Sequence, residues 1–388
     1  MWQKPSATET STATIGLNEK REYNHKDIGK RGTNGCHRRR NMSEGEKRLV
    51  QFELLRVVAM LGILMNHVFN YGLHIYDDFT LEVSSSGDFL LWSVLQLMKL
   101  MALPSVNCYI LITGFFMVNN SKWRIKGIWK VWSTTCFYAV SIYLLAVAIG
   151  LCPFQWDEML NHATPLYHNN YWFVTSYIAL MLLAPLLSWG LQRLSQRQYL
   201  LTLALGFIVC FQFLLGRFVM DGQQILLFVY LFMIGGYIRR YHEGPQKRKA
   251  WIVVISVLIL MLMYGVAIFK NMNVEGHDYY IYAMEYHGLV LPLSVAIFLL
   301  FKNLTIKGMV LRKVIYALAP LCFSVYIIHT QSVVDKYLWQ YATEMFADSP
   351  TFMIPLLVLL LCVSVFLICC AIDYLRVRIA GMLKKTLW

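Results

Sequence analysis

A chain of 388 residues with 57% hydrophobic and only 15% charged residues is too apolar for a soluble protein, since soluble domains carry about 25% charged residues and bury apolar surface in cores of limited size. The net charge of +13 does not indicate nucleic-acid binding, because the basic residues form short clusters between apolar runs, as they do on the cytoplasmic side of membrane proteins. The nine cysteines show no Cys-x-x-Cys spacing, so we expect neither a disulfide framework nor a metal site.

Residues 1–47 form a polar N-terminal extension rich in Thr, Asn, Lys and Arg. This composition predicts disorder, and the extension lacks the apolar core of a signal peptide. A second methionine, Met42, opens a more ordinary start, and we hypothesise that residues 1–41 are dispensable. Residues 48–388 are expected to form one multi-pass membrane domain.

Apolar segments follow one another through the rest of the chain, and runs of about 20 apolar residues match the thickness of the bilayer hydrocarbon. Pro104 is expected to break the second segment, because proline lacks the backbone N–H of a helix interior. The fold class predicted is an all-α integral membrane protein with about ten transmembrane helices. We place these at residues 51–72, 88–118, 128–150, 170–190, 199–216, 223–238, 250–269, 283–301, 314–333 and 351–373.

The loops between these segments predict the orientation. If the N-terminus is cytoplasmic, the inner loops and the C-terminal tail hold 19 Lys and Arg residues, and the outer loops hold three. This asymmetry follows the positive-inside rule, so we expect both termini in the cytoplasm and the protein in the plasma membrane. The outer loops carry acidic residues, and they also carry aromatic residues, as at 279–282.

The first span carries three ionisable side chains, Glu53, Arg56 and His67, in apolar surroundings. Glu53 and Arg56 are three residues apart and can pair on one helix face. Arg56 and His67 are eleven residues apart, which places them within roughly 20° of one face and roughly 16 Å apart along the axis. Ionisable groups at such depth usually face a bundle interior or a water-filled path.

We call Glu53, Arg56 and His67 the ionisable stripe of this helix. One interpretation of the stripe is catalytic. Arg56 would hold a phosphate of a nucleotide-like donor by paired hydrogen bonds. His67 would act as general base on an acceptor hydroxyl, because the pKa of an imidazole lies near working pH. The alternative is structural: Arg56 extends to the inner surface, and His67 bonds a neighbouring helix.

Four segments resemble the membrane acyltransferase type-3 family, over most of the chain from about residue 48. The first is the Arg-x10-His pattern of Arg56 and His67. Residues 106–117, which contain Thr-Gly-Phe, are similar to the end of the family's second span. Residues 171–185, with Tyr-Trp-Phe and a later Pro, resemble the fourth span of capsule and exopolysaccharide members. Residues 323–329, ending in Tyr-Ile-Ile-His, resemble a late span.

The resemblance implies O-acetylation of surface polysaccharides or other glycans, with acetyl-CoA as donor and no metal. It implies that His67 is the catalytic histidine and that Arg56 is essential on the donor path. Glu53 stands where many members have Asp, and Thr113 stands where Ser commonly precedes the glycine, here Gly114. No fused extracellular domain is evident, which favours direct transfer at the membrane.

Basic residues near the inner surface are further candidates. Lys122 and Arg124 could attract the phosphates of coenzyme A, or they could be a topology signal only. Lys99 is a cation within the second span, and we expect it to pair with Asp88 or Glu82, or to extend to the interface.

Aromatic and histidine side chains of later spans could also serve the site. Trp172 and Tyr177 could stack on a sugar ring, although interfacial anchoring explains them as well. His329, with Tyr326, could line the active cavity or serve packing alone.

The function predicted is therefore a membrane O-acyltransferase that moves an acyl group, expected to be acetyl, from cytoplasmic acetyl-CoA to a hydroxyl of a cell-surface polysaccharide or lipid-linked saccharide. The main alternative is a transporter or flippase for a lipid-linked sugar, in which the intramembrane charges form a substrate or proton path. A lipid- or peptide-acylating membrane enzyme and an inactive scaffold are weaker alternatives. No sequence feature selects one acceptor glycan, a covalent acyl-enzyme or an oligomeric state.

Overall fold

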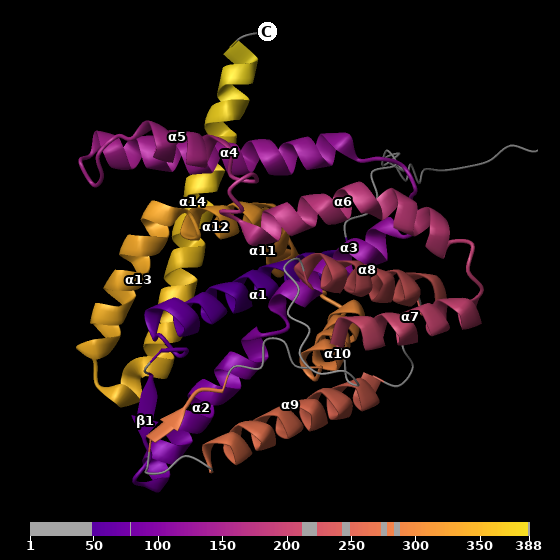
Figure 1. Cartoon of the computed structure of the whole chain (residues 1–388), viewed down its shortest axis with the longest axis horizontal. Coiled ribbons are helices and arrows are strands. Elements are labelled where there is room, and N and C mark those ends of the chain that lie inside the picture. Colours follow the sequence, from indigo (N-terminus) through magenta and orange to yellow (C-terminus); the bar gives the residue numbers. More distant parts are fainter. Residues whose placement is uncertain are drawn as a thin grey trace, which may run out of the picture. The chain divides into compact units, whose positions relative to one another are not determined.

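The computed structural model describes residues 49–77, 79–211, 223–242, 249–272, 278–282 and 288–386. The predicted N-terminal extension, residues 1–47, lies outside the described residues, as do residues 212–216 and 283–287 of two predicted spans. The described elements, shown in Figure 1, are mainly helical. In chain order they are α1 (Val50–His67), the π-helix η1 (Val68–Gly72), β1 (Thr80–Glu82), α2 (Ser86–Ala102), α3 (Ser105–Met117), α4 (Ile125–Ala148), α5 (Trp156–Ala163), α6 (Trp172–Leu191), α7 (Gln196–Phe211), α8 (Gln223–Tyr241), α9 (Lys249–Asn271), β2 (Asp278–Tyr280), α10 (Val290–Lys302), α11 (Met309–Leu318), η2 (Ala319–Leu321), α12 (Cys322–His329), α13 (Ser332–Ala347), η3 (Thr351–Met353) and α14 (Ile354–Thr386).

Helices long and apolar enough to cross a membrane confirm a multi-pass helical protein. Within a bilayer, backbone groups must be satisfied internally, which favours helices for such apolar segments. The predicted spans near 199–216, 223–238 and 283–301 correspond to α7, α8 and α10, of which α10 has 13 residues and is shorter than the roughly 20 that span a bilayer. Ten spans and the orientation stay predictions. In the described part of the chain, seven segments meet the criteria of length and composition: Val50–Gly72, Ser86–Met117, Ile125–Ala148, Trp172–Leu191, Ala250–Asn271, Met309–His329 and Thr351–Met382.

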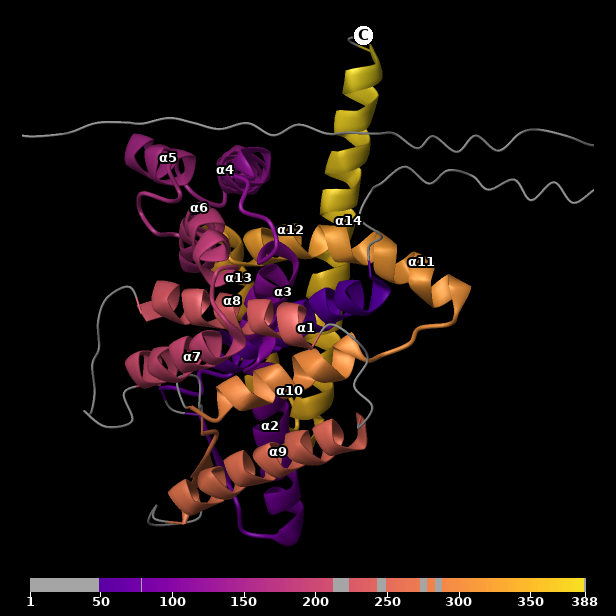
Figure 2. The same ribbon diagram turned by 90° about the vertical axis from the view of Figure 1, so that its right-hand side faces the viewer.

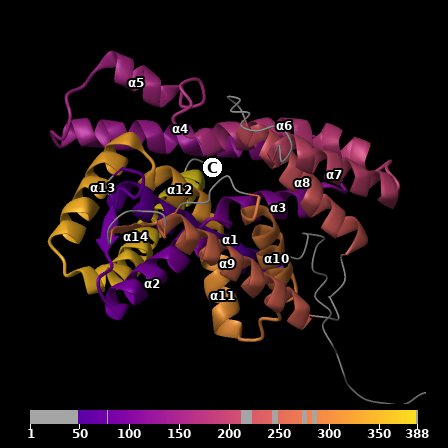
Figure 3. The same cartoon turned by 60° about the horizontal axis from the view of Figure 1, so that its bottom comes forward.

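Helix α1 lies within the bundle and contacts α2, α3, α10, α11, α12 and α14. Figures 2 and 3 show α14 crossing beside α1 and α12, while α3 and α10 lie on the other side of α1. The helix that carries the ionisable stripe is thus surrounded by other helices.

The second predicted span is interrupted where expected. Helix α2 ends at Ala102 and α3 begins at Ser105, with Pro104 between them, because proline cannot donate the helical hydrogen bond. The carbonyl oxygen of Ala102 accepts a hydrogen bond from Asn66 Nδ2 at 3.0 Å. The break therefore ties α2 to α1 at the residue before His67.

Helices α3 and α8 are in close contact through glycines. A Cβ at Gly114 would overlap the backbone of Phe232, and a Cβ at Gly235 would overlap the carbonyl oxygen of Leu111. Small residues let helix backbones approach in this way. The glycine of the Thr-Gly-Phe segment is therefore explained by packing.

A short antiparallel sheet was not predicted from the sequence. β1 pairs with β2 through Thr80 opposite Tyr280 and Glu82 opposite Asp278. The carbonyl oxygen of Tyr280 also accepts a hydrogen bond from Trp92 Nε1 at 3.1 Å. The aromatic loop segment is thereby attached to α2.

Candidate active site

A cavity of about 250 Å³ lies among α1, α3, α4, α6 and the η2–α12 segment. Four of its lining residues, spaced three or four apart, form one face of α1. The next position on this face is His67. The cavity is lined by Glu53, Arg56, Met60, Ile63, Tyr109, Ile112, Thr113, Val131, Phe173, Tyr177, Ala319, Pro320, Cys322, Phe323 and Tyr326.

A partly buried ion pair forms the polar end of this cavity. Arg56 Nη1 lies 2.8 Å from Glu53 Oε1, which confirms the predicted pairing. The Glu53 side chain is 5% exposed and that of Arg56 is 33% exposed, so the guanidinium compensates a carboxylate that would be costly to bury alone. Tyr109 Oη donates to the Arg56 carbonyl oxygen at 2.6 Å and supports α1 at this point. A guanidinium has five N–H donors, so Arg56 can bind an anionic ligand while it pairs with Glu53.

Two histidines from distant parts of the sequence meet beyond the other end of the cavity. His67 Nδ1 lies 3.0 Å from His329 Nε2. His329 is fully buried, whereas His67 is partly exposed. Helix α1 supplies one ring and the last residue of α12 supplies the other. The residue predicted as catalytic is thus hydrogen-bonded to a second predicted site residue.

The hydrogen bonds around this pair fix the tautomers of the neutral rings. His329 Nδ1 lies 2.7 Å from the Val325 carbonyl oxygen, which can only accept, so His329 carries its proton on Nδ1. His329 Nε2 then has the lone pair, and the proton between the rings belongs to His67 Nδ1. The remaining nitrogen, His67 Nε2, is unprotonated. This is the form of an imidazole that can take a proton from a substrate.

Two aromatic side chains that do not line the cavity, Trp339 and Tyr71, lie next to the histidine pair. The Trp339 ring lies 6.2 Å from that of His67 and 6.5 Å from that of His329, centroid to centroid. Trp339 Nε1 donates to Asp335 Oδ1 at 2.6 Å. Burial raises the pKa of Asp335, and the bond from Trp339 opposes that shift. The centroid of the Tyr71 ring lies 5.4 Å from that of His67, and Tyr71 is 47% exposed. An accessible aromatic side chain therefore lies next to His67.

The helix changes its winding directly after His67. Residues Val68–Gly72 form a π-helix, and the Gly72 carbonyl oxygen accepts a hydrogen bond from Thr343 Oγ1 of α13 at 3.0 Å. Short π-helical turns often occur at functional sites. Tyr71, whose ring lies 5.4 Å from that of His67, belongs to this turn.

The other predicted site residues divide between the cavity and the surface. Tyr177 lines the cavity with Arg56, and its hydroxyl lies 3.4 Å from Thr113 Oγ1. Trp172 does not line the cavity; it is 39% exposed and packs against Phe173. The structure thus places the two aromatic residues of α6 in different surroundings.

The basic residues at the N-terminal end of α4 lie outside the cavity lining. Lys122 is exposed, and its backbone N–H donates to the Asn120 side chain at 2.9 Å. Arg124 is the residue before α4 and is partly exposed. Their predicted contact with coenzyme A stays a prediction.

The expectation for Lys99 was wrong. Lys99 is fully buried and its ammonium group donates to Asn70 Oδ1 at 2.6 Å. Asp88 caps α2 through Ser85, and the Glu82 carboxylate accepts from Ser84. The buried cation is hydrogen-bonded to the amide oxygen of Asn70, a residue of the π-helix η1.

Several residues of the site were missed from the sequence. Tyr109 lies in the segment that resembles the family's second span, which was a usable signal. Trp339 and Asp335 lie on α13, a segment that reads as a polar outer loop. Their i, i+4 spacing is compatible with a helix, but nothing in it indicates contact with His67.

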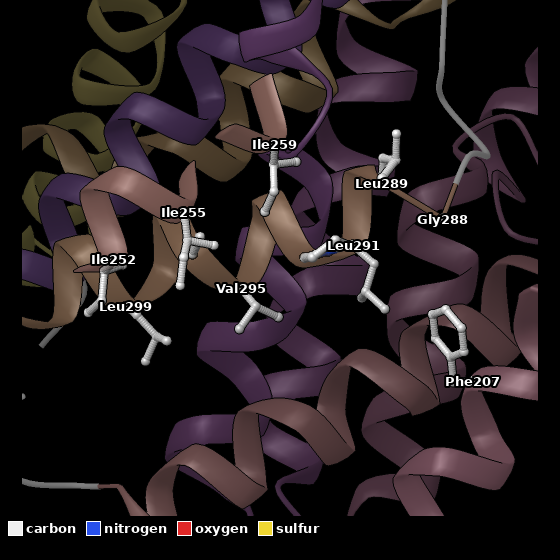
Figure 4. A pocket seen from close by; sticks show the side chains of 11 residues that line it. Phe207, Ile252, Ile255, Ile259, Gly288, Leu289, Leu291, Val295 and Leu299 are labelled. Carbon is white, nitrogen blue, oxygen red and sulfur yellow. The ribbon is translucent and has the colours of Figure 1, made fainter. Parts of the chain in front are cut away.

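A second cavity differs in chemistry. Its volume is about 680 Å³, and Figure 4 shows its lining residues, which come from α7, α9, α10 and the two residues before α10. They are all apolar, so none could transfer a proton or bind a phosphate. They are Phe207, Ile252, Ile255, Ile259, Gly288, Leu289, Leu291, Pro292, Val295, Ala296 and Leu299.

A family model described as an acyltransferase domain, acyltransferase family 3, matches residues 49–374. The match covers well over half of the 388 residues and includes the ion pair, the cavity and the histidine pair. No curated protein and no solved structure matches the chain.

Proposed function

The chain belongs to the acyltransferase 3 family and is a multi-pass membrane acyltransferase, and we propose that it moves an acetyl group from cytoplasmic acetyl-CoA to a hydroxyl of a cell-surface polysaccharide or other glycan in the plasma membrane. The observation that carries the proposal is the hydrogen-bonded pair of His67 and His329, which lies one helical turn beyond a cavity that contains Arg56. The bond from His329 to the Val325 carbonyl oxygen implies that Nε2 of a neutral His67 is the nitrogen free to accept a proton.

The proposed chemistry is a direct transfer with His67 as general base. His67 Nε2 takes the proton of the acceptor hydroxyl, and the oxygen attacks the thioester carbonyl carbon. The tetrahedral intermediate collapses, the carbon–sulfur bond breaks, and the imidazolium returns the proton to the leaving sulfur. The products are the ester and coenzyme A. A thioester is already activated, so the protein supplies mainly positioning and proton transfer.

His329 acts through His67 and not on the substrate. Its Nε2 accepts the hydrogen bond from His67 Nδ1–H. This bond orients the His67 ring and stabilises the positive charge that His67 acquires in the reaction. The same logic governs the carboxylate of a Ser-His-Asp triad, where the partner fixes the tautomer of the histidine. His329 is therefore a positioning residue in the proposal.

The donor would bind along the face of α1. Arg56 and His67 are about 16 Å apart along the helix axis, and the cavity of about 250 Å³ is smaller than the roughly 300–1,000 Å³ of sites that enclose a whole ligand. The volume suits the thioester arm alone. The nucleotide end would remain near the inner surface, where Arg56, Lys122 and Arg124 offer positive charge.

The acceptor would approach from the other side of His67. His67 is partly exposed, and Tyr71 beside it is 47% exposed. An accessible aromatic ring next to the base suits a hydroxyl-rich ligand, because such rings have an apolar face and a polar tip. Donor and acceptor would thus reach the histidine from opposite ends of the stripe.

The test is transfer of radiolabelled acetyl from acetyl-CoA into envelope glycan by membranes of matched expression. We expect alkali-labile label with the wild type and with His168→Ala, a histidine substitution at an exposed position away from the cavity. His67→Ala should lose the label, and Arg56→Ala should lose most of it when acetyl-CoA is kept below its KM. Label that persists in both variants would refute the assigned roles, and no label with any protein would favour the transporter.

A further inference from the structure

Tyr326 separates the cavity from the histidine pair. Its side chain lines the cavity, is 5% exposed, and lies with its ring centroid 5.9 Å from that of His329. The two residues are one turn apart on α12. One aromatic ring therefore contacts the cavity on one side and the proton-transfer pair on the other.

Two further side chains complete this end of the cavity. The Phe173 ring lies 5.4 Å from that of Tyr326 and is stacked on Tyr177 at 5.7 Å, so α6 holds it in place. Ile63 lines the cavity from α1 and precedes His67 by one helical turn. We call Ile63, Phe173 and Tyr326 the end wall.

The position of the end wall limits what can be attached to the donor sulfur. The thioester carbonyl must pass the end wall to reach His67, so the bound donor displaces these side chains in part and the acyl chain beyond the carbonyl packs against them. A packed interior resists added methylene groups, since over-filling it forces side chains out of their preferred rotamers. Among the acyl chains, the methyl group of acetyl needs the least volume beside the end wall.

On the basis of the proposed function, we propose that the end wall determines acyl-chain length, and that Tyr326 is the residue that excludes chains longer than acetyl. Replacing the ring with a smaller side chain opens the cavity toward the histidine pair and admits propionyl and butyryl groups. The reaction itself is unchanged: the same carbon–sulfur bond breaks, and the same ester bond forms.

The expected size follows from the discrimination of one methylene group in an apolar pocket, which is about 10- to 200-fold. Wild-type membranes should therefore transfer butyryl at least about tenfold less than acetyl. Tyr326→Leu should raise the ratio of butyryl to acetyl transfer by about tenfold or more. The ratio is measured in one membrane preparation, so differences in expression cancel.

The experiment compares radiolabelled acetyl-CoA, propionyl-CoA and butyryl-CoA with the same envelope acceptor. Tyr326→Phe keeps the ring, and Tyr167→Leu makes the matched substitution at a position that is 87% exposed; both should keep the wild-type ratio. Ile63→Ala opens the end wall from α1 and should raise the ratio independently of α12.

Two results would overturn the inference. The first is acetyl transfer by Tyr326→Leu and Ile63→Ala with a wild-type chain-length ratio. The second is wild-type protein that transfers butyryl as fast as acetyl. If the wild type transfers no acyl group from any of the three donors, the proposed function fails first, and this result is distinct from an unchanged ratio.

Discussion

His329→Phe tests the dependence of the site on the histidine pair. Phenylalanine keeps an aromatic ring against Tyr326 and Trp339, whose centroids lie 5.9 Å and 6.5 Å from that of His329, but it removes the acceptor for His67 Nδ1–H. A hydrogen bond to a charged group contributes about 1.5–3 kcal/mol, and His67 is charged during the proposed transfer. The expected loss in transfer rate is therefore about 10- to 150-fold, at 1.36 kcal/mol for each tenfold.

The size and pattern of the loss distinguish this role from packing. His67→Ala should cost more, about 10²- to 10⁴-fold, because it removes the base itself. The double variant should be no slower than His67→Ala, since residues that act as a unit are not additive. His329→Gln should recover part of the rate, because its amide oxygen can accept the bond from His67.

The assay is the initial rate of acetyl transfer at saturating acetyl-CoA, with expression measured for each variant. A rate for His329→Phe within about twofold of wild type would refute the reasoning, since the predicted loss is at least about tenfold. Equal rates for the Phe and Gln variants would show that the hydrogen bond is not what matters.

Three other predictions concern the ion pair, a helix contact and pH. Arg56→Ala should raise the KM for acetyl-CoA about 10- to 150-fold, the loss of a charge-assisted hydrogen bond, and should lower the melting temperature because Glu53 stays buried; an unchanged KM would contradict the donor role. Gly114→Ala should destabilise by about 1–3 kcal/mol through overlap with α8, whereas Gly190→Ala, which meets no atom within 4 Å, should not, as thermal unfolding in detergent can compare. The pKa of Asp335 is raised above its ordinary 3.8, so the contribution of the protonated carboxyl to stability is present at acid pH and lost as pH rises through the folded-state pKa. Asp335→Asn should therefore be more stable than wild type at pH 7 but not at pH 3. A stability difference that does not change with pH would contradict this prediction.

The part of the site that lies on one helix could be predicted from the sequence. The 3.6-residue period places Glu53, Arg56 and His67 on one face, and the structure has the ion pair and the cavity along that face. Proline chemistry likewise predicted the break at Pro104. Both inferences depend on local geometry, which sequence spacing determines.

Contacts between elements could not be predicted in this way. His67 and His329 are 262 residues apart, and their hydrogen bond depends on how α12 packs beside α1. The sequence groups Tyr177 with Trp172, as residues for sugar stacking or interfacial anchoring, but α6 places Tyr177 in the cavity with Arg56. The Lys99 ammonium group on α2 donates to the Asn70 amide oxygen on η1. Spacing rules within one helix cannot predict a contact between two different helices.

In the proposed reaction His67 is the general base for direct transfer of an acyl group from a cytoplasmic donor to an acceptor at the outer face. The most direct measurement loads sealed right-side-out vesicles with radiolabelled acetyl-CoA and follows alkali-labile label on glycan at the outer face. We predict that label accumulates outside with the wild type, with release of coenzyme A inside, and that His67→Ala accumulates none. External label with His67→Ala, or intact donor and no label with the wild type in the presence of its envelope glycan, would contradict the account.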